Sequence, residues 1–270
     1  MSARIQRTAR VGPEACWDGN EQASSAPPSH SLQQLDGARL SAAAATVVVV
    51  VVLVLLNLIE HLLHGALWLG PLVSVALLAF ARWTGLTWSQ LGLSPDRLRS
   101  GCRWAIGAIV VVAGVYLIGT LVPTTRQAFL DTRYRLTVPG ALLSAFVVIP
   151  LGTVLVEEIA FRSVLWGTLA RHARTSGVLV ASSALFGLWH ILPSLHLAAA
   201  NQGVGNAVHG AGGSATALVV ASTVAFTAVG GVLIGELRRR SGSVLASIGM
   251  HWATNGLGVL VGVLLWRVSG

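Results

Sequence analysis

The stretch Val156–Arg162, which reads VEEIAFR, places two adjacent carboxylates and an arginine inside an apolar run over residues 140–170. A charged side chain near the centre of a bilayer costs roughly 2.5–3.5 kcal/mol on insertion scales, so these charges need compensation. On a helix Glu158 and Arg162 are four positions apart and can pair. Glu157 lies about 100° away around the axis and has no local cation, which makes it a candidate functional carboxylate. The alternative is that both glutamates cap the inner end of a short span at the membrane interface.

Composition places the chain in a membrane. Of its 270 residues, 54% are hydrophobic and only 10% are charged, whereas soluble chains carry about 25% charged residues. The apolar blocks are long enough for helices and too continuous for barrel strands. We therefore expect an all-α fold, a polytopic membrane helix bundle of about seven transmembrane helices, with the active site in the C-terminal half.

The net charge of +8 does not indicate a nucleic-acid partner, because the arginines cluster in short loops between apolar blocks. The predicted spans are residues 40–59, 66–83, 104–122, 140–170, 178–195, 215–237 and 244–266.

Three regions are predicted along the chain. Residues 1–38 are polar and rich in Ser, Pro and Gly, which predicts a disordered N-terminal tail. Residues 39–139 hold the first three spans and carry no motif. Residues 140–270 form the predicted catalytic transmembrane core, with a kink expected at Pro150.

The arginine distribution predicts the orientation. Clusters at 97–103 and 238–240 alternate along the chain with arginine-poor connections, so the positive-inside rule places the N-terminus in the cytoplasm of a multi-pass cell-membrane protein. The connection 123–139 is the exception, because it carries three arginines on the predicted outer side. The glycine-rich loop 196–214 has no Lys or Arg and is predicted to be flexible and external.

Polar groups on three predicted helices converge in depth. Counted from the arginine-marked end of each helix, Glu157 and His190 lie roughly 18–20 Å deep. On the same scale His251 and Asn255, one turn apart on a third helix, lie on the order of 10–17 Å deep. We expect these groups to share one site, with the ring of Phe186 packed beneath the imidazole four positions later.

Two other patterns are interpreted as incidental. Residues 60–64 read EHLLH, a reordered version of a zinc motif, and are interpreted as polar residues at a membrane surface. Cys16 and Cys102 lack metal-ligand spacing.

Three ordered motifs on three apolar segments carry a family resemblance: EExxxR at 157–162, FxxxH at 186–190 and HxxxN at 251–255. They resemble the motifs of the CPBP family, which includes CAAX prenyl proteases of the Rce1 type and bacteriocin self-immunity proteins of the Abi type. The resemblance covers about residues 140–266, and no motif position departs from the pattern.

The resemblance implies an intramembrane endopeptidase that hydrolyses a peptide bond without an acyl-enzyme. By analogy Glu157, assisted by His190, is the general base that activates water, and His251 with Asn255 holds the developing oxyanion. A carboxylate in a low-dielectric cavity is a stronger base toward water, and each oxyanion donor commonly contributes about 3–4 kcal/mol.

Further implications concern the remaining motif residues and ligands. Glu158 and Arg162 would form a structural pair that orients Glu157. Family members are often called metalloproteases, which leaves open a divalent metal such as zinc with Glu157 and His190 as candidate ligands; no other cofactor is expected. The implied partners are a peptide or membrane-protein substrate, in CAAX-type processing for example, and the lipid bilayer.

Two other classes of function use the same residues. A non-enzymatic membrane binding or immunity protein would be expected to have lost a motif residue, and none is lost. A proton-coupled transporter could use the glutamate and the histidines as a relay. Against a transporter, the chain shows no internal repeat and its buried polar groups all fall in the second half.

Overall fold

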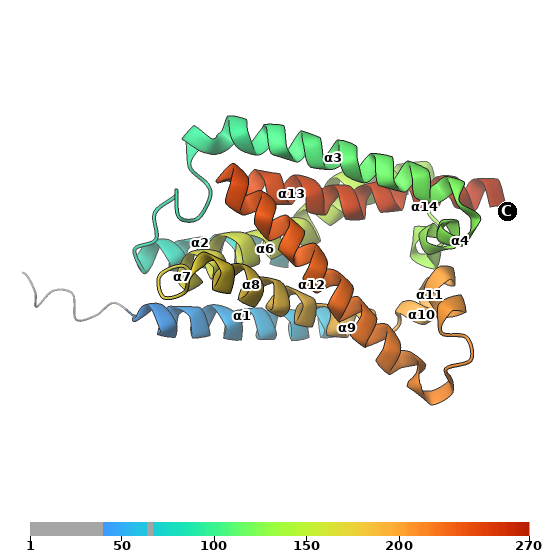
Figure 1. Ribbon diagram of the computed structural model, residues 1–270, viewed down its shortest axis with the longest axis horizontal. Helices are drawn as coiled ribbons and strands as arrows, with labels where there is room; N and C mark the ends of the chain where they lie inside the picture. The colour runs from blue at the N-terminus through green and yellow to red at the C-terminus, as the bar shows by residue number, and fades with distance from the viewer. Residues whose placement is uncertain (1–39, 64–66, 270) are drawn as a thin grey trace, which may run out of the picture. The chain divides into compact units, whose positions relative to one another are not determined.

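The computed structural model describes residues 40–63 and 67–269, so the predicted disordered tail at 1–38 lies outside the described residues, as do Cys16 and His64. The described part of the chain forms helices joined by turns and short connections, with no β-strand (Figure 1). The all-α class predicted from composition is therefore confirmed.

Five helical segments of the described chain are long and apolar enough to cross a membrane: Ala42–Leu62, Pro95–Leu121, Val138–Leu169, Gly212–Ser241 and Val244–Val268. Two shorter apolar helices, Leu69–Trp83 and Thr175–Trp189, account for the other two predicted spans. Each has 15 residues and is about 22 Å long, less than the roughly 30 Å of a bilayer core. The membrane helix bundle is confirmed; the cytoplasmic N-terminus and the division at residue 140 stay predictions.

Four of the predicted spans are single helices, and their bounds are α1 Ala42–Leu63, α2 Leu69–Trp83, α3 Leu98–Leu121 and α12 Ala215–Ser241. A fifth, predicted at 178–195, begins with α8 Thr175–Trp189 and is interrupted after it. The helix α3 begins six residues before the predicted residue 104, because a 3₁₀ turn at Pro95–Arg97 leads directly into it. Proline at the first helical position has its φ angle already set for a helix.

The other two predicted spans are built from several pieces. The fourth comprises α5 (Val138–Leu143), α6 (Leu155–Glu158) and α7 (Trp166–Leu169), and the last comprises α13 (Val244–Trp252) and α14 (Gly258–Ser269). The pieces are joined by π-helical segments, at Ser144–Val148, Pro150–Val154, Ile159–Leu165 and Ala253–Leu257.

The π-helical segments coincide with two of the motifs. Wide turns of this kind are rare and occur frequently at functional sites. One follows Pro150, whose ring cannot donate a backbone hydrogen bond, at the position of the predicted kink. Another contains Arg162, and the last contains Asn255.

The charged stretch lies in the protein core. Every residue from Val156 to Leu169 is buried, with α1 and α2 packed on one side and α8 also in contact. The surrounding hydrophobic cluster includes Leu53, Leu77 and Phe186 from these three helices. A helix that protein encloses on every side normally carries apolar residues on every face. The charges of this stretch are therefore buried in the protein interior. This placement does not support the alternative in which both glutamates cap a short span at the membrane interface.

The two long connections at the far end of the bundle pack together. The predicted flexible loop forms the short helices α10 (Leu197–Ala200) and α11 (Gln202–Ala207), which lie near α4 (Pro123–Arg126) in Figure 1. Asn201 donates from Nδ2 to the carbonyl of Ala128 at 2.8 Å. Backbone and side-chain hydrogen bonds therefore order this glycine-rich loop.

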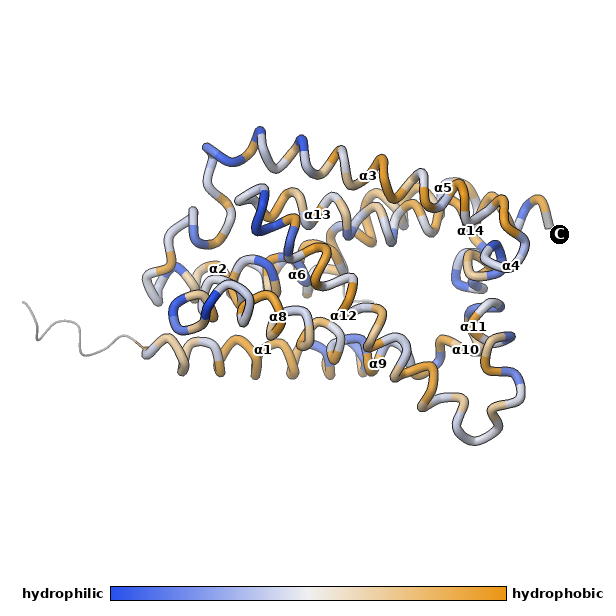
Figure 2. The backbone as a smooth tube through the Cα atoms, viewed as in Figure 1, coloured by the Kyte–Doolittle hydropathy of each residue, from blue (hydrophilic) through white to orange (hydrophobic). Residues whose placement is uncertain are grey.

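The connection 123–139 was the exception to the positive-inside rule, and two of its three arginines have partners within the fold. Arg133 donates to both oxygens of buried Asp131, at 2.8 and 2.7 Å. The guanidinium of Arg135 lies 4.0 Å from the ring centroid of Trp266. Figure 2 shows hydrophilic backbone near α4 and α11 at this end.

Candidate functional site

Glu158 stands at the centre of a buried charged cluster. Its Oε1 lies 3.2 Å from Nη1 of Arg162 and accepts a hydrogen bond from Nδ1 of His251 at 2.8 Å. All three side chains are at most 6% exposed. The predicted pair of Glu158 and Arg162 is present, and it includes a histidine from α13 that the sequence did not place there.

Arg162 makes two contacts besides its ion pair with Glu158, one through its guanidinium and one through its backbone carbonyl. Its guanidinium carbon lies 3.8 Å from the ring centroid of Phe186, a cation–π contact in a desolvated place. Its carbonyl accepts a hydrogen bond from the second buried arginine, Arg238, at 3.1 Å. The charge is thus compensated by Glu158 and by the ring.

Glu157 has two differently surrounded oxygens. Its Oε1 accepts a hydrogen bond from the indole N–H of Trp189 at 3.1 Å. Its Oε2 lies 3.7 Å from Nε2 of His251 and accepts no hydrogen bond from the described residues. The imidazole of His251 therefore lies between the two carboxylates and links Glu158 to Glu157.

His190 occupies the break after α8. Its Nδ1 lies 2.8 Å from the carbonyl oxygen of Phe186, and because a carbonyl only accepts, Nδ1 must carry the proton. A neutral ring then presents the lone pair of Nε2. The ring centroids of Phe186 and His190 are 4.8 Å apart, which confirms the predicted packing of one beneath the other.

The predicted continuous span 178–195 is wrong at this point. The helix α8 ends at Trp189, and α9 (Ile191–Ser194) follows. Pro193 explains the break, since its ring clashes with the carbonyl four residues earlier, that of Trp189. His190 is consequently at a helix end.

Asn255 lies in the π-helical segment of the last span. Such a segment leaves backbone groups without their usual helical partners, and Tyr116 of α3 donates to the carbonyl of Thr254 at 2.6 Å. Trp252 donates from its indole to the carbonyl of Ala145 at 2.8 Å. These two contacts hold the chain just before Asn255.

A cavity of about 520 Å³ brings the predicted residues together, because Glu157, His190 and Asn255 all line it. Glu158 and Arg162 lie deeper, as does His251, and none of the three lines the cavity. The convergence predicted from depth is therefore observed for three residues directly. Glu158, Arg162 and His251 lie behind the residues that line the cavity.

Sequence reasoning missed two residues that line this cavity, Glu60 and Trp189, and a third, Asn57, that bonds to its wall. Glu60 of α1 lines it, although it was interpreted as a membrane-surface residue. Asn57, three positions earlier, donates to the carbonyl of Trp189 at 2.8 Å. Residues three apart lie on one helix face, so these two polar residues were a signal that this face of α1 meets the site. Trp189 itself adjoins His190, and a buried indole needs an acceptor.

Metal binding finds limited geometric support. Among the described residues no group of three or more His, Cys, Asp and Glu side chains is placed to hold a metal ion. A catalytic zinc normally takes three protein ligands, which Glu157 and His190 alone do not supply. Zinc stays a hypothesis, and no step below is routed through a metal.

Comparisons with known proteins identify the region that carries the site. Residues 139–257 match the family model described as type II CAAX prenyl endopeptidase Rce1-like. No curated protein and no solved structure matches the chain. The matched range contains all three motifs together with α8, α12 and α13. The match over residues 139–257 supports the predicted resemblance to the CAAX prenyl protease family, and the apolar helices indicate a multi-pass membrane protein.

Proposed function

We propose that this protein is an intramembrane endopeptidase of the CAAX type in which Glu157 is the general base. The observation that carries the proposal is the asymmetry of this carboxylate on the cavity wall. One oxygen is held by Trp189, and the other accepts no hydrogen bond from the described residues. A base must be oriented through one atom and free at the other to take a proton from water.

His190 assists by orienting the same water. With Nδ1 bonded to the Phe186 carbonyl, the lone pair of Nε2 can accept the second hydrogen of a water that faces Glu157. The proton goes to Glu157, the hydroxide oxygen bonds to the peptide carbonyl carbon, and the carbonyl oxygen becomes an oxyanion. Collapse of this intermediate breaks the C–N bond, and the proton held by Glu157 passes to the leaving amine.

Asn255 and His251 stabilise the oxyanion in unequal ways. The amide of Asn255 lines the cavity and donates directly, whereas His251 lies behind Glu157. His251 can donate from Nε2 only as an imidazolium, because its Nδ1–H is committed to Glu158. The Glu158–Arg162 pair thus positions His251 and, through it, Glu157.

The proposed substrate is a peptide or membrane protein whose scissile bond enters this cavity. The cavity carries carboxylates at Glu60 and Glu157 and a guanidinium at Arg133, so a polar backbone can be oriented within it. Recognition of a CAAX-type sequence is the finer part of the proposal and is supported by the family match.

The test uses the full-length protein, purified in detergent, with a peptide library that includes CAAX-type sequences with and without a prenyl group. Glu157→Gln should remain folded and lose about 10²–10⁴-fold in kcat, the usual contribution of a general base. Asp96→Asn, which alters an exposed carboxylate near the start of α3, is the matched control and should cleave like wild type.

Two outcomes would count against the proposal. Full turnover by Glu157→Gln would exclude this residue as the base. A wild-type protein that binds peptides but cleaves none would favour the membrane binding or immunity alternative. Chelation followed by zinc addition, in the same assay, tests the metal hypothesis.

A further inference from the structure

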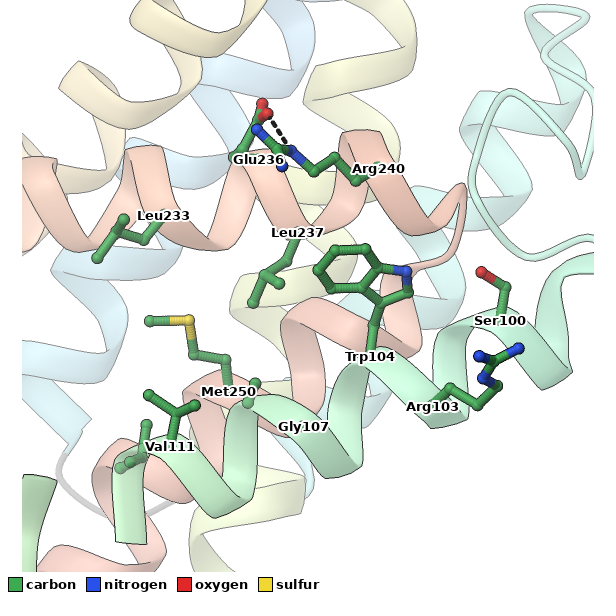
Figure 3. Close-up of a pocket in the computed structure, with 12 residues that line it drawn as sticks. Ser100, Arg103, Trp104, Gly107, Val111, Leu233, Glu236, Leu237, Arg240 and Met250 are labelled. Atoms are coloured by element: carbon green, nitrogen blue, oxygen red, sulfur yellow. Dashed lines mark hydrogen bonds and ion pairs between the residues drawn. The ribbon is translucent and has the colours of Figure 1, made fainter. Parts of the chain in front are cut away.

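A second hollow lies outside the catalytic cavity. The helices α3 and α12 each pack on α13, and between them is a groove of about 790 Å³ (Figure 3). Figure 3 shows Trp104 of α3 and Leu237 of α12 extending toward one another, with Met250 of α13 beneath. None of the groove-lining residues lines the catalytic cavity.

One end of the groove is cationic. Arg103 and Ser100 of α3 line it there, and Arg240 of α12 also lines the groove, with its guanidinium turned toward Glu236 (Figure 3). Arg103 is exposed and makes no hydrogen bond or ion pair with any residue that the structure describes. Arg240 shares Glu236 with Arg239, which binds both oxygens of that carboxylate. Among the groove-lining residues, two arginines therefore stand against the one carboxylate of Glu236, and one positive charge remains in excess.

The rest of the groove is apolar and open to the outside. Val111 is 66% exposed, Leu233 is 53% exposed and Trp104 is 40% exposed. Apolar side chains left open on a transmembrane helix contact acyl chains. Trp104 lies between the arginine end and the apolar end (Figure 3), the place that tryptophan favours at a membrane interface.

We propose that this groove binds one anionic phospholipid. Its phosphate lies between Arg103 and Arg240, since guanidinium groups donate paired hydrogen bonds to phosphate oxygens. One acyl chain runs between α3 and α12, over Leu237 and Met250. Basic pockets between transmembrane helices bind anionic headgroups in this manner.

The site is joined to the catalytic cluster through one helix. Met250 lines the groove, while its neighbour His251 points inward to Glu158. A lipid bound in the groove therefore contacts the side of α13 that carries Met250, and it bridges α13 to α3 and α12. The expected result is a higher melting temperature of the lipid-bound protein.

The experiment measures lipid retention by native mass spectrometry and melting temperature in neutral detergent, with the full-length protein. The probes are phosphatidylglycerol, phosphatidylcholine and a farnesylated peptide, each added alone and then phosphatidylglycerol against the peptide. Wild type should retain one phosphatidylglycerol in preference to phosphatidylcholine and melt at a higher temperature with it. Arg103→Gln with Arg240→Gln should remove this preference, by about fivefold for each arginine; Arg99→Gln, exposed and outside the groove, should keep it.

A second pair of variants tests the apolar part without a risk of unfolding. Gly107 lines the groove, and a Cβ there meets no atom within 4 Å, so Gly107→Leu fills the groove and also improves helix propensity. It should abolish lipid retention. Gly114→Leu, equally free of neighbours within 4 Å and outside the groove, should not.

Three results would overturn the proposal. Equal retention of the two phospholipids by wild type would remove the phosphate site. Unchanged retention in Gly107→Leu would place the lipid elsewhere. Displacement of phosphatidylglycerol from wild type by the farnesylated peptide, with the peptide itself retained by wild type but not by Gly107→Leu, would assign the groove to a prenyl chain.

Discussion

The helix α3 and the segment Val138–Leu169 both meet the length and hydropathy requirements of a membrane span, yet α3 and the second half of that segment, from Val156 onward, occupy opposite environments. Along α3 only Gly101 and Val112 are buried, and the helix is unbroken. The second segment is broken by π-helical turns, and all of Val156–Leu169 is enclosed. Hydropathy therefore identifies a span but does not say whether lipid or protein surrounds it.

The charged residues of a span indicate whether lipid or protein surrounds it. A buried ion pair is tolerable only where its geometry is good and neighbours satisfy its remaining groups. Glu158 and Arg162 are compensated by His251 and the ring of Phe186, although Oε2 of Glu158 and both Nη atoms of Arg162 make no hydrogen bond with the described residues. Lipid cannot supply such partners. A span that carries this motif has to lie inside the bundle, whereas α3 keeps its arginines near one end and can face outward.

The largest expected effect is on stability, from breaking the buried pair. Glu158→Gln leaves Arg162 without a counter-charge, and removal of one partner of a buried pair costs about 3–5 kcal/mol. Arg99→Gln, at the exposed end of α3, should change stability by less than about 0.5 kcal/mol. Unfolding of both variants in one detergent measures the contrast. Equal stabilities would mean that enclosure of the charged segment carries no energetic weight.

A somewhat smaller effect is expected on turnover from the oxyanion donors. Asn255→Ala should lower kcat by about 10²–10³-fold with KM nearly unchanged, because the interaction strengthens only in the transition state. Combined with His251→Ala, the loss should be less than the product of the single losses. Ser144→Ala, another cavity-lining change, is the control. A lowered melting temperature with intact turnover per folded molecule would assign both residues to packing.

The hydrogen bond that orients Glu157 gives the next effect. Trp189→Phe removes the indole donor but keeps an aromatic ring, and a hydrogen bond to a charged group contributes about 1.5–3 kcal/mol. We expect kcat to fall roughly ten- to hundredfold. Trp83→Phe changes a tryptophan that is 57% exposed and should leave the rate unaltered. Wild-type kcat in Trp189→Phe would show that Glu157 needs no such orientation.

Local pattern predicted much of this architecture. The seven apolar segments follow from continuous hydrophobic runs, and the approach of Glu157, His190 and Asn255 follows from motif order and depth. These features depend on residues near one another in sequence, or on a count along one helix.

The features that were missed depend on contacts between helices. The spacing of Asn57 and Glu60 marks one polar face of α1, but only the packing of α1 against the other helices decides that this face meets the cavity. The insertion of His251 between two carboxylates is of the same kind. The end of α8 at Trp189 is different, since Pro193 was a local signal that the long apolar run concealed.

The smallest effect concerns an ion pair at the end of the bundle, outside the spans. Burial raises the pKa of the Asp131 carboxyl, but hydrogen bonds from the side chain and backbone of Arg133 outweigh burial, so this pKa lies below 3.8. A depressed carboxyl pKa adds stability that is present above 3.8, the value expected on unfolding, and is lost as the pH falls through the folded value.

Because Arg133 is 58% exposed, solvent screens the pair, and Asp131→Asn should cost no more than about 1 kcal/mol at neutral pH. The difference in melting temperature between wild type and Asp131→Asn should therefore be small at pH 7 and shrink further below pH 4. A gap that stayed constant with pH would assign the loss to the 3₁₀ turn at Thr132–Tyr134, which the same side chain caps. A loss as large as that of Glu158→Gln would remove the contrast between a sealed and a solvated ion pair.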